Sequence, residues 1–422
     1  MIKNIPCFPN PTFAVLSLLL AFLLSNIALA QTNNQSDEID RHRKGDLIIK
    51  GKPGEKVEVE QLSHEFWFGA AISNSLASGK MAEEDLKQYK EKFLENFNSA
   101  VTENAVKWAT MESKKGEVDY SIVDGILEWT DENNIPLRGH NLFWGIPKFV
   151  QPWVMDLTDE ELKETIKNRA ETITAKYKGR FVEYDLNNEM VHGNYYKDRL
   201  GSDITKWMAD WALNGDPEAK LFLNDYNILT GKSLPAYMAQ IRGLLEQGVP
   251  IAGIGVQGHS HGETFDREQL KAALDSLGLF NLPIRVTEFN IPGQNSAFYR
   301  EDIKEMTPEE EATKAAEMVD FYKICFAHPA VEGILMWGFW EGANWIPVSS
   351  LYKRDWTPTP AVEAYQDLIF KEWWTQESGT INEKGSLAIP VFYGKYKVTV
   401  NGQSKEVMVS KEDKMSQVDF ME

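Results

Sequence analysis

Two glutamates in the middle of the chain stand just after short apolar runs: Glu189 follows residues 181–186, and Glu288 follows residues 284–286. A pair of carboxylates on opposite sides of a cleft can hydrolyse a glycosidic bond, because the oxocarbenium-like transition state needs a proton on one side and negative charge on the other. The pKa values of the pair must then differ, so that one glutamate is protonated while the other is ionised. The alternative is that each is an ordinary surface or ion-pairing residue among the 63 acidic side chains.

Short apolar runs alternate with segments of helical pattern through the central part of the chain. The eight runs are residues 66–72, 97–102, 137–143, 181–186, 221–223, 253–256, 284–286 and 333–337. This alternation predicts a (β/α)8 barrel, in which parallel strands form an inner ring and helices cover it. The alternative, a doubly wound open sheet, would carry a glycine-rich phosphate-binding turn after an early strand, and residues 68–72 contain no such turn.

Two helix starts in this region have the spacing of a capping box, Thr158 to Glu161 and Thr307 to Glu310. After the second of them, apolar residues recur at helical spacing and predict the buried face of that helix: Ala312, Ala315, Val319, Tyr322 and Phe326. Cys325 lies in the same apolar segment, so we expect a buried, unreactive thiol.

Polar and aromatic residues follow nearly every one of the eight runs. In a (β/α)8 barrel the carboxyl ends of the strands form the active site, which would place Glu189 and Glu288 across one mouth from each other. There Asn188 could bond a sugar 2-hydroxyl group, and His259 could bond Glu288 and help to keep it ionised. In this setting we favour a catalytic pair over two surface residues.

The first 30 residues have the pattern of a secretory signal peptide. A weakly basic start at Lys3 precedes an apolar run over residues 13–24 and a small-x-small site at residues 28–30. We expect cleavage after Ala30 and a secreted or periplasmic protein; the alternative is an uncleaved N-terminal anchor. Because Cys7 lies in the removed part, the mature chain would keep one cysteine and form no internal disulfide.

Alternating apolar and polar residues predict β strands at both ends of the remaining chain. After a polar linker over residues 31–40, residues 46–50 and 56–62 predict a hairpin, and strand patterns return after residue 386. We expect the two ends to form one small β module with the barrel inserted between them; the alternative is two unrelated flaps. The predicted division is 1–30 signal peptide, 31–64 linker and N-terminal β segment, 65–375 barrel, and 376–422 C-terminal β segment.

The composition is that of an acidic globular protein. Formal charge is 44 − 63 = −19, which disfavours nucleic acid as a partner because no basic stripe offsets it. Apolar residues at 43% and charged residues at 25% exclude a disordered chain. The 13 tryptophans suit sugar rings and a large core equally. We expect a monomer with a polysaccharide substrate, no cofactor, no bound metal and no membrane contact after signal cleavage.

Taken together, the motifs resemble glycoside hydrolase family 10, the endo-β-1,4-xylanases. The matching segments, in order over roughly residues 64–372, are Phe97-Asn98, Glu103-Asn104 with Lys107-Trp108, Arg138-Gly139-His140 with Trp144, Tyr184-Asp185 with Asn188-Glu189, Asn224-Asp225-Tyr226-Asn227, Gly255 to His259, Thr287-Glu288, and Trp337-Gly338 with Trp345. The resemblance implies a retaining double displacement with Glu189 as acid/base and Glu288 as nucleophile. The substrate-binding residues that it implies are Glu103, Asn104, Lys107, His140, Trp144, Asn188, Gln257, His259, Trp337 and Trp345, with Tyr226 and Asn290 in supporting positions.

The sequence departs from the family pattern at three positions. Asn290 stands where the family has an aspartate that orients the histidine beside the nucleophile, so we expect the acidity of this histidine–glutamate pair to differ and the pH optimum to move. Gly145 stands where many members have a histidine, so one sugar contact would be missing. Asn187 is less usual in the family. These changes bear on the preferred substrate and rate more than on the class of reaction.

Three other functions are considered. A metal-dependent hydrolase could use histidines near the strand ends, but its His-x-His pair is expected on the first strand, whereas His259 and His261 follow the sixth run. A barrel that binds glycans without turnover would have lost a catalytic glutamate, and both are present. A family 10-like hydrolase could also act on another β-glycan, such as a mixed-linkage or β-1,4-glucan.

Overall fold

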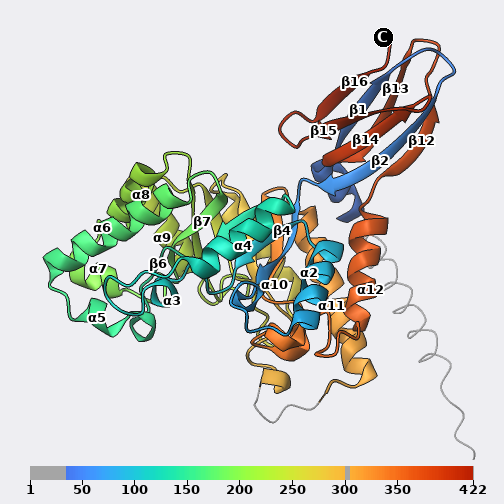
Figure 1. Cartoon of the computed structure of the whole chain (residues 1–422). Helices are drawn as coiled ribbons and strands as arrows, with labels where there is room; N and C mark the ends of the chain where they lie inside the picture. Colours follow the sequence, from blue (N-terminus) through green and yellow to red (C-terminus); the bar gives the residue numbers. More distant parts are fainter. Residues whose placement is uncertain (1–34, 300–304, 422) are drawn as a thin grey trace, which may run out of the picture.

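The computed structural model describes residues 35–299 and 305–421, so the expected signal peptide lies outside the described residues. Its central part is a ring of parallel strands covered by helices (Figure 1). The strands are β3 (Trp67–Ile72), β4 (Ser99–Thr102), β5 (Leu137–Gly139), β6 (Phe143–Trp144), β7 (Phe181–Asn188), β8 (Lys220–Asp225), β9 (Gly253–Val256), β10 (Ile284–Phe289) and β11 (Val331–Met336). Their order is β5-β4-β3-β11-β10-β9-β8-β7-β6, and β5 also pairs with β7, which closes the ring. The predicted (β/α)8 barrel is confirmed.

One predicted strand is divided in two. The run over residues 137–143 forms β5 and then β6, and both pieces pair with β7. The ladder stops at the His140–Asn141 segment, where the chain leaves the sheet and returns two residues later. Side-chain hydrogen bonds replace the ladder there, since His140 N–H donates to Thr102 Oγ1 at 3.0 Å.

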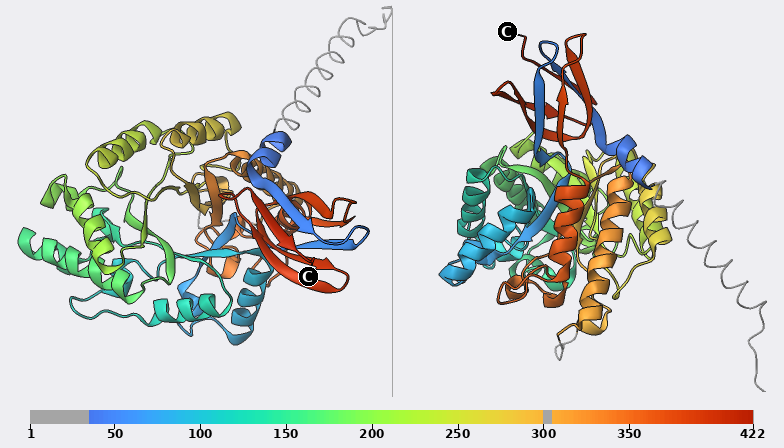
Figure 2. Two further views of the ribbon diagram at one scale, coloured as in Figure 1. Left: turned by 90° about the horizontal axis from the view of Figure 1, so that it is seen from above. Right: turned by 90° about the vertical axis from the view of Figure 1, so that its right-hand side faces the viewer.

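Helices fill the outer layer between successive strands (Figure 2). They are α2 (Glu83–Asn96), α3 (Trp108–Met111), α4 (Ser121–Glu132), α5 (Pro152–Met155), α6 (Asp159–Lys176), α7 (Tyr195–Leu200), α8 (Ile204–Gly215), α9 (Leu234–Glu246), α10 (Arg267–Gly278), α11 (Pro308–Ala327) and α12 (Pro360–Asp367). Both predicted capping boxes are formed, at the starts of α6 and α11. Each satisfies two backbone donors that the first helical turn would leave open.

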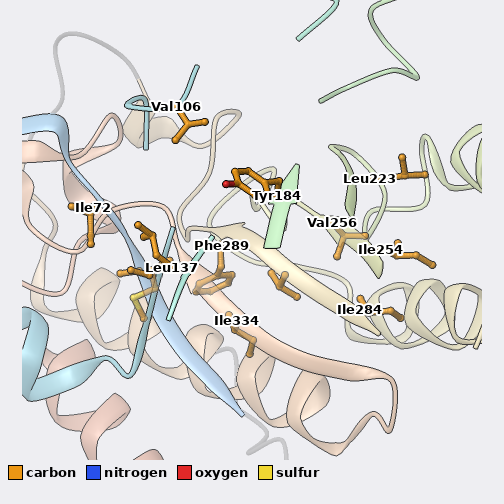
Figure 3. Close-up of a cluster of buried hydrophobic side chains, with 14 of the residues drawn as sticks. Ile72, Val106, Leu137, Tyr184, Leu223, Ile254, Val256, Ile284, Phe289 and Ile334 are labelled. Carbon is orange, nitrogen blue, oxygen red and sulfur yellow. The ribbon is translucent and has the colours of Figure 1, made fainter. Parts of the chain in front are cut away.

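Branched and aromatic side chains from the strands and helices fill one large core. Figure 3 shows the part of it that the barrel strands contribute, such as Ile72, Leu137 and Val256. Every residue of β4, β9 and β10 is buried. Such strands have both faces covered, one by the barrel interior and one by helices, so even the polar side chains of β10, Arg285, Thr287 and Glu288, are buried. Cys325 is buried and unpaired, and burial raises the pKa of its thiol, as expected for an inert cysteine.

The predicted buried face of α11 is partly wrong. Ala312 is exposed, whereas Glu311 and Lys314 are buried. The Lys314 ammonium lies 2.7 Å from the Glu311 carboxylate and donates to the backbone oxygens of Val348 and Ser350 at 3.0 and 3.1 Å. Charged residues can therefore face inward here because their polar ends form ion pairs and hydrogen bonds. The spacing of apolar residues along the sequence does not reveal such contacts.

The strands at the two ends of the chain form two small sheets, which we call the β module. One sheet contains β13 (Ser386–Phe392), β1 (Lys44–Lys50) and β16 (Met415–Asp419), and the other contains β12 (Gln376–Thr380), β2 (Lys56–His64), β14 (Gly394–Val400) and β15 (Gln403–Val409). Strands β1 and β2 lie in different sheets, so the predicted hairpin over residues 46–62 is wrong. The two strands separate because β1 and β2 each contribute apolar side chains to one shared cluster, which they cover from opposite sides.

Residues 35–43 are helical, although a linker was predicted as far as residue 40. Glu38 pairs with Arg41 and lies 3.0 Å from His42, contacts that support a short helix. At its end, Arg43 is buried and donates to the backbone oxygens of Phe326, His328 and Val331 at 2.5 to 2.7 Å.

The β module lies against the amino ends of several barrel strands. A cavity of about 360 Å³ between them is lined by module residues such as Tyr393 and Lys411 and by strand starts such as Trp67 and Lys220. Figure 2 shows the module projecting from one end of the barrel. The carboxyl ends of the strands open at the opposite end. Within residues 35–299 and 305–421, the helices are too short or too polar to cross a bilayer.

Candidate active site

Glu189 lies one residue beyond β7, at the carboxyl end of the barrel. A register shift between Asp185 and Asn188 bends the strand just before it. Glu189 itself has a φ of +58°, a conformation that non-glycine residues adopt only when the surroundings hold them there. Its N–H donates to the Asn224 carbonyl at 2.8 Å, which fixes this turn.

The Glu189 carboxylate has only neutral hydrogen-bond donors. Trp144 Nε1 donates to Oε2 at 2.9 Å, and Gln257 Nε2 donates to Oε1 at 2.8 Å. Burial raises the pKa of Glu189, and the nearby charge of Glu288 raises it further against the effect of the two donors. A carboxyl group in this state retains its proton at pH values where ordinary glutamates have lost it.

Glu288 lies on β10, within a register shift between Val286 and Phe289. Its Oε1 accepts from Asn224 Nδ2 at 2.9 Å, and its Oε2 lies 3.2 Å from His259 Nε2. Burial on its own would raise the pKa of Glu288. The charges of His140, His259 and Lys107 and the hydrogen bond from His259 outweigh burial and lower it to about 2.

Asn224, near the end of β8, contacts both glutamates, the backbone of Glu189 and the carboxylate of Glu288. Its carbonyl holds the Glu189 backbone, while its side-chain nitrogen donates to Glu288 and also to Asn188 Oδ1 at 3.0 Å. Thr287 Oγ1 donates to Asn224 Oδ1 at 2.7 Å and fixes the amide orientation. Asn224 lies in one of the segments that resemble family 10, but the sequence predicted no role for it. Its position after the fifth apolar run was the available signal.

His259 lies between Glu288 and Asn290. Its Nδ1 is 2.8 Å from Asn290 Oδ1, which makes Asn290 the second partner of the imidazole. Asn290 is buried, and its Nδ2 has no hydrogen-bond partner within the described residues. An aspartate at this position would place a negative charge where the amide oxygen lies.

Three of the expected binding residues form one polar group beside the glutamates. Lys107 Nζ donates to Asn104 Oδ1 at 2.8 Å and lies 4.9 Å from the ring centre of Trp144. Burial raises the pKa of the Glu103 carboxyl and lowers the pKa of Lys107, against the attraction between their charges. The site therefore holds a lysine among several carboxylates.

Aromatic rings surround this polar group. Trp337 contacts His140 edge to face with ring centres 5.2 Å apart, and the partly exposed Trp345 lies 5.1 Å from His259. Tyr226 stacks on His192 with ring centres 3.8 Å apart. Flat faces next to carboxylates and amides suit a sugar chain.

Buried ion pairs beneath the site hold its histidine. Asp185 Oδ2 accepts from His140 Nδ1 at 2.8 Å, and the same carboxylate binds Arg138. Arg138 also binds Glu183, whose second partner is Arg285. Sequence reasoning did not assign roles to these charged residues, which are 45 or more positions apart in most of the pairs.

The departures at Gly145 and Asn187 have different surroundings. A Cβ added to Gly145 would lie 3.2 Å from the Gly193 carbonyl and 3.3 Å from the Tyr196 ring, so a side chain there would require these neighbours to shift by a few tenths of an ångström. Asn187 is buried, and its Oδ1 has no partner within the described residues.

The histidines at this end have separate partners. His192 Nδ1 lies 2.8 Å from Asp225 Oδ1, while His261 bonds Asn227. In the two described ranges no three histidine, cysteine or acidic side chains are grouped as metal ligands would be. What the residues do present is one carboxyl group with a raised pKa and one with a lowered pKa, beside amides and aromatic rings. Such a difference is what cleavage of a glycosidic bond by an acid and a nucleophile requires.

Several known proteins are similar to this chain in sequence, and solved structures are similar to it in fold. The anti-sigma-I factor RsgI6 of Acetivibrio thermocellus is 36% identical over 89% of this chain and 47% of that protein, and endo-1,4-beta-xylanase 1 of Arabidopsis thaliana is 35% identical over 88% and 38%. The chain thus spans less than half the length of these relatives. Xylanase 10B from Thermotoga petrophila, solved in complex with xylobiose, superposes with a TM-score of 0.64 at 25% identity over 73% of this chain and 95% of that chain. The model of Glycosyl hydrolase family 10 matches residues 59–368. The chain belongs to this family.

Proposed function

We propose that the protein is a retaining endo-β-1,4-xylanase. The observation that carries this proposal is the unequal environment of two glutamates at one barrel mouth: the half-buried Glu189 with neutral donors and a raised pKa, and the buried Glu288 with cationic neighbours and a lowered pKa. Membership of family 10 and similarity to proteins named as endo-1,4-beta-xylanases support xylan as the substrate. Export from the cytoplasm is a prediction from residues 13–30, outside the described range.

In this mechanism the Glu288 carboxylate attacks the anomeric carbon while Glu189 protonates the leaving glycosidic oxygen. The glycosidic bond breaks and a covalent glycosyl–Glu288 ester forms. Glu189, now ionised, takes a proton from water as that water attacks the same carbon. Sugar is released with retained configuration, Glu288 returns to the carboxylate, and Glu189 regains its proton.

Reducing-sugar release from soluble glucuronoxylan, compared between wild type and Glu288→Ala, tests the proposal. We expect release by wild type alone. Equal release by the variant would remove Glu288 from the mechanism. Parallel assays on mixed-linkage and β-1,4-glucan test the choice of glycan, and a faster rate on either would replace xylan.

A second candidate function is glycan binding without turnover, which the similarity to an anti-sigma factor favours. It predicts retention of the protein on insoluble xylan, no sugar release from any β-glycan, and equal retention of Glu288→Ala.

A further inference from the structure

A pocket of about 500 Å³ opens beside the proposed glycone subsites. It shares Asn104, Lys107 and Trp144 with the candidate active site. Its lining also includes Lys148 and Phe149 from the loop before α5 and residues 108–110 of α3. Figure 1 shows where α3 and α5 lie on the barrel. The shared residues make the pocket an extension of the cleft that holds Glu189.

The wall of the pocket is an aromatic pair. Phe149 stacks on Trp144 with ring centres 3.8 Å apart and planes inclined by 21°. The Trp144 indole nitrogen points to Glu189, so this ring connects the pocket directly to the proposed acid/base. Lys148 Nζ lies 4.6 Å from the centre of the Phe149 ring.

The charge of the pocket is opposite to that of the protein. Two lysines line it and no carboxylate does, in a chain of net charge −19. Lys107 is balanced by Glu103, Glu189 and Glu288 on its cleft side. Lys148 is exposed, and within the described residues no carboxylate lies within 4 Å of its ammonium.

A buried acceptor adds to this charge. Asn141 lines the pocket and is fully buried, yet its Oδ1 has no hydrogen-bond partner within the described residues. An unpaired buried carbonyl oxygen is costly unless a ligand or a water donates to it. A sugar hydroxyl group is such a donor.

We propose that this pocket binds an anionic side group of the polysaccharide, a uronic acid attached to the xylan backbone, with Lys148 as the residue that pairs with its carboxylate. The inference rests on the proposed xylanase function and specifies its substrate. The uronic ring lies against the Trp144–Phe149 wall, one hydroxyl group donates to Asn141, and the carboxylate reaches Lys148.

The test compares kcat/KM on three substrates: glucuronoxylan, the same polymer after its uronic carboxyl groups have been reduced to alcohols, and unsubstituted xylohexaose. The readout is the ratio of native to reduced polymer. We expect wild type to favour the native polymer by about 2- to 5-fold, the range of a partly exposed ion pair, with the ratio falling at high salt.

Lys148→Met keeps the aliphatic stem and should bring the ratio to about one, while Lys148→Glu should bring it below one. Lys384→Met, a remote exposed lysine of the β module, makes the same change in net charge and should keep the wild-type ratio. A wild-type ratio of one, or a ratio that Lys148→Met leaves unchanged, overturns the pocket assignment. Failure to cleave any of the three substrates overturns the xylanase function instead, so the two failures are distinguishable.

Discussion

Glu183 and Glu189 stand six residues apart, at opposite ends of β7. Glu183 is bound by the guanidinium groups of Arg138 and Arg285, whose charges outweigh burial and lower its pKa. Glu189 is bound only by an indole and an amide N–H, and burial raises its pKa. One strand therefore carries a carboxylate that stays ionised at the closed end of the barrel and a carboxyl group able to exchange its proton at the open end.

The difference shows what burial does with and without a compensating cation. A buried carboxylate between two guanidinium groups is held in its charged form, and removing one partner leaves an uncompensated charge. A buried carboxylate with neutral donors keeps its proton longer and can act as an acid. The β module lies at the same end of the barrel as Glu183, because its residues and the strand starts line one cavity with that carboxylate.

The largest expected effect separates the two glutamates of the mouth. Glu288→Ala should lower kcat on an aryl β-xylobioside by about 10⁴-fold or more, and Glu189→Ala should lower it less, by about 10²- to 10⁴-fold. Azide, which needs no general base, should restore both. Product analysis by NMR should show an α-glycosyl azide from Glu288→Ala, since azide replaces the nucleophile, and a β-glycosyl azide from Glu189→Ala, since the covalent intermediate still forms. The same anomer from both variants would contradict the assignment.

At the closed end, the expected effect is on stability. Glu183→Ala leaves Arg138 and Arg285 without their shared carboxylate and should lower the free energy of unfolding by about 3–5 kcal/mol in urea titrations at pH 7. Part of this contribution depends on pH. Because the folded-state pKa of Glu183 is lowered, its stabilisation is present above the unfolded value and is lost as pH falls through the folded value.

The matched control is Glu189→Gln, directly after the same strand. The pKa of Glu189 is raised in the folded state, so its ionisation costs stability as pH rises above the unfolded value. The variant should therefore be at least as stable as wild type at pH 7. Similar losses in both variants would remove the contrast between the two ends.

A smaller effect concerns the pH profile of kcat/KM. Ionisation of Glu288 should set its acid limb and ionisation of Glu189 its alkaline limb. Trp144→Phe removes a donor that favours the charged form of Glu189, so the pKa of Glu189 should rise and the alkaline limb should move to higher pH. As a control, Trp153→Phe removes an indole that donates to the Glu112 backbone carbonyl and not to Glu189. The alkaline limb of this variant should stay at the wild-type pH. An unchanged limb in Trp144→Phe would show that another group sets it.

The smallest expected effect is at Asn290. Asn290→Asp places a carboxylate 2.8 Å from His259 Nδ1 and should stabilise the imidazolium form beside Glu288. The imidazole signals in ¹⁵N NMR should then show the charged form persisting to higher pH, with a moved kcat/KM profile. Asn281→Asp, exposed at the opposite end of the barrel, controls for net charge. Identical profiles for wild type and Asn290→Asp would reject a role for the amide in the acidity of the site.

The eight strands were predictable because short strand-like runs alternate regularly with helical segments, and the glutamates were found because they follow two of these runs. The same local rules identified the capping boxes of α6 and α11. They did not separate β1 from β2, since alternation shows that a strand has one buried face and not which sheet it joins.

Residue types and their order along the chain therefore determined the barrel, the pair of candidate carboxylates and the rings around them. Only the tertiary structure decided which carboxylate would hold its proton. That depends on burial and on partners far away in sequence: Trp144 and Gln257 for Glu189, Asn224 and His259 for Glu288. A pKa responds to charge and solvent within a few ångströms, and sequence separation carries no information about those distances.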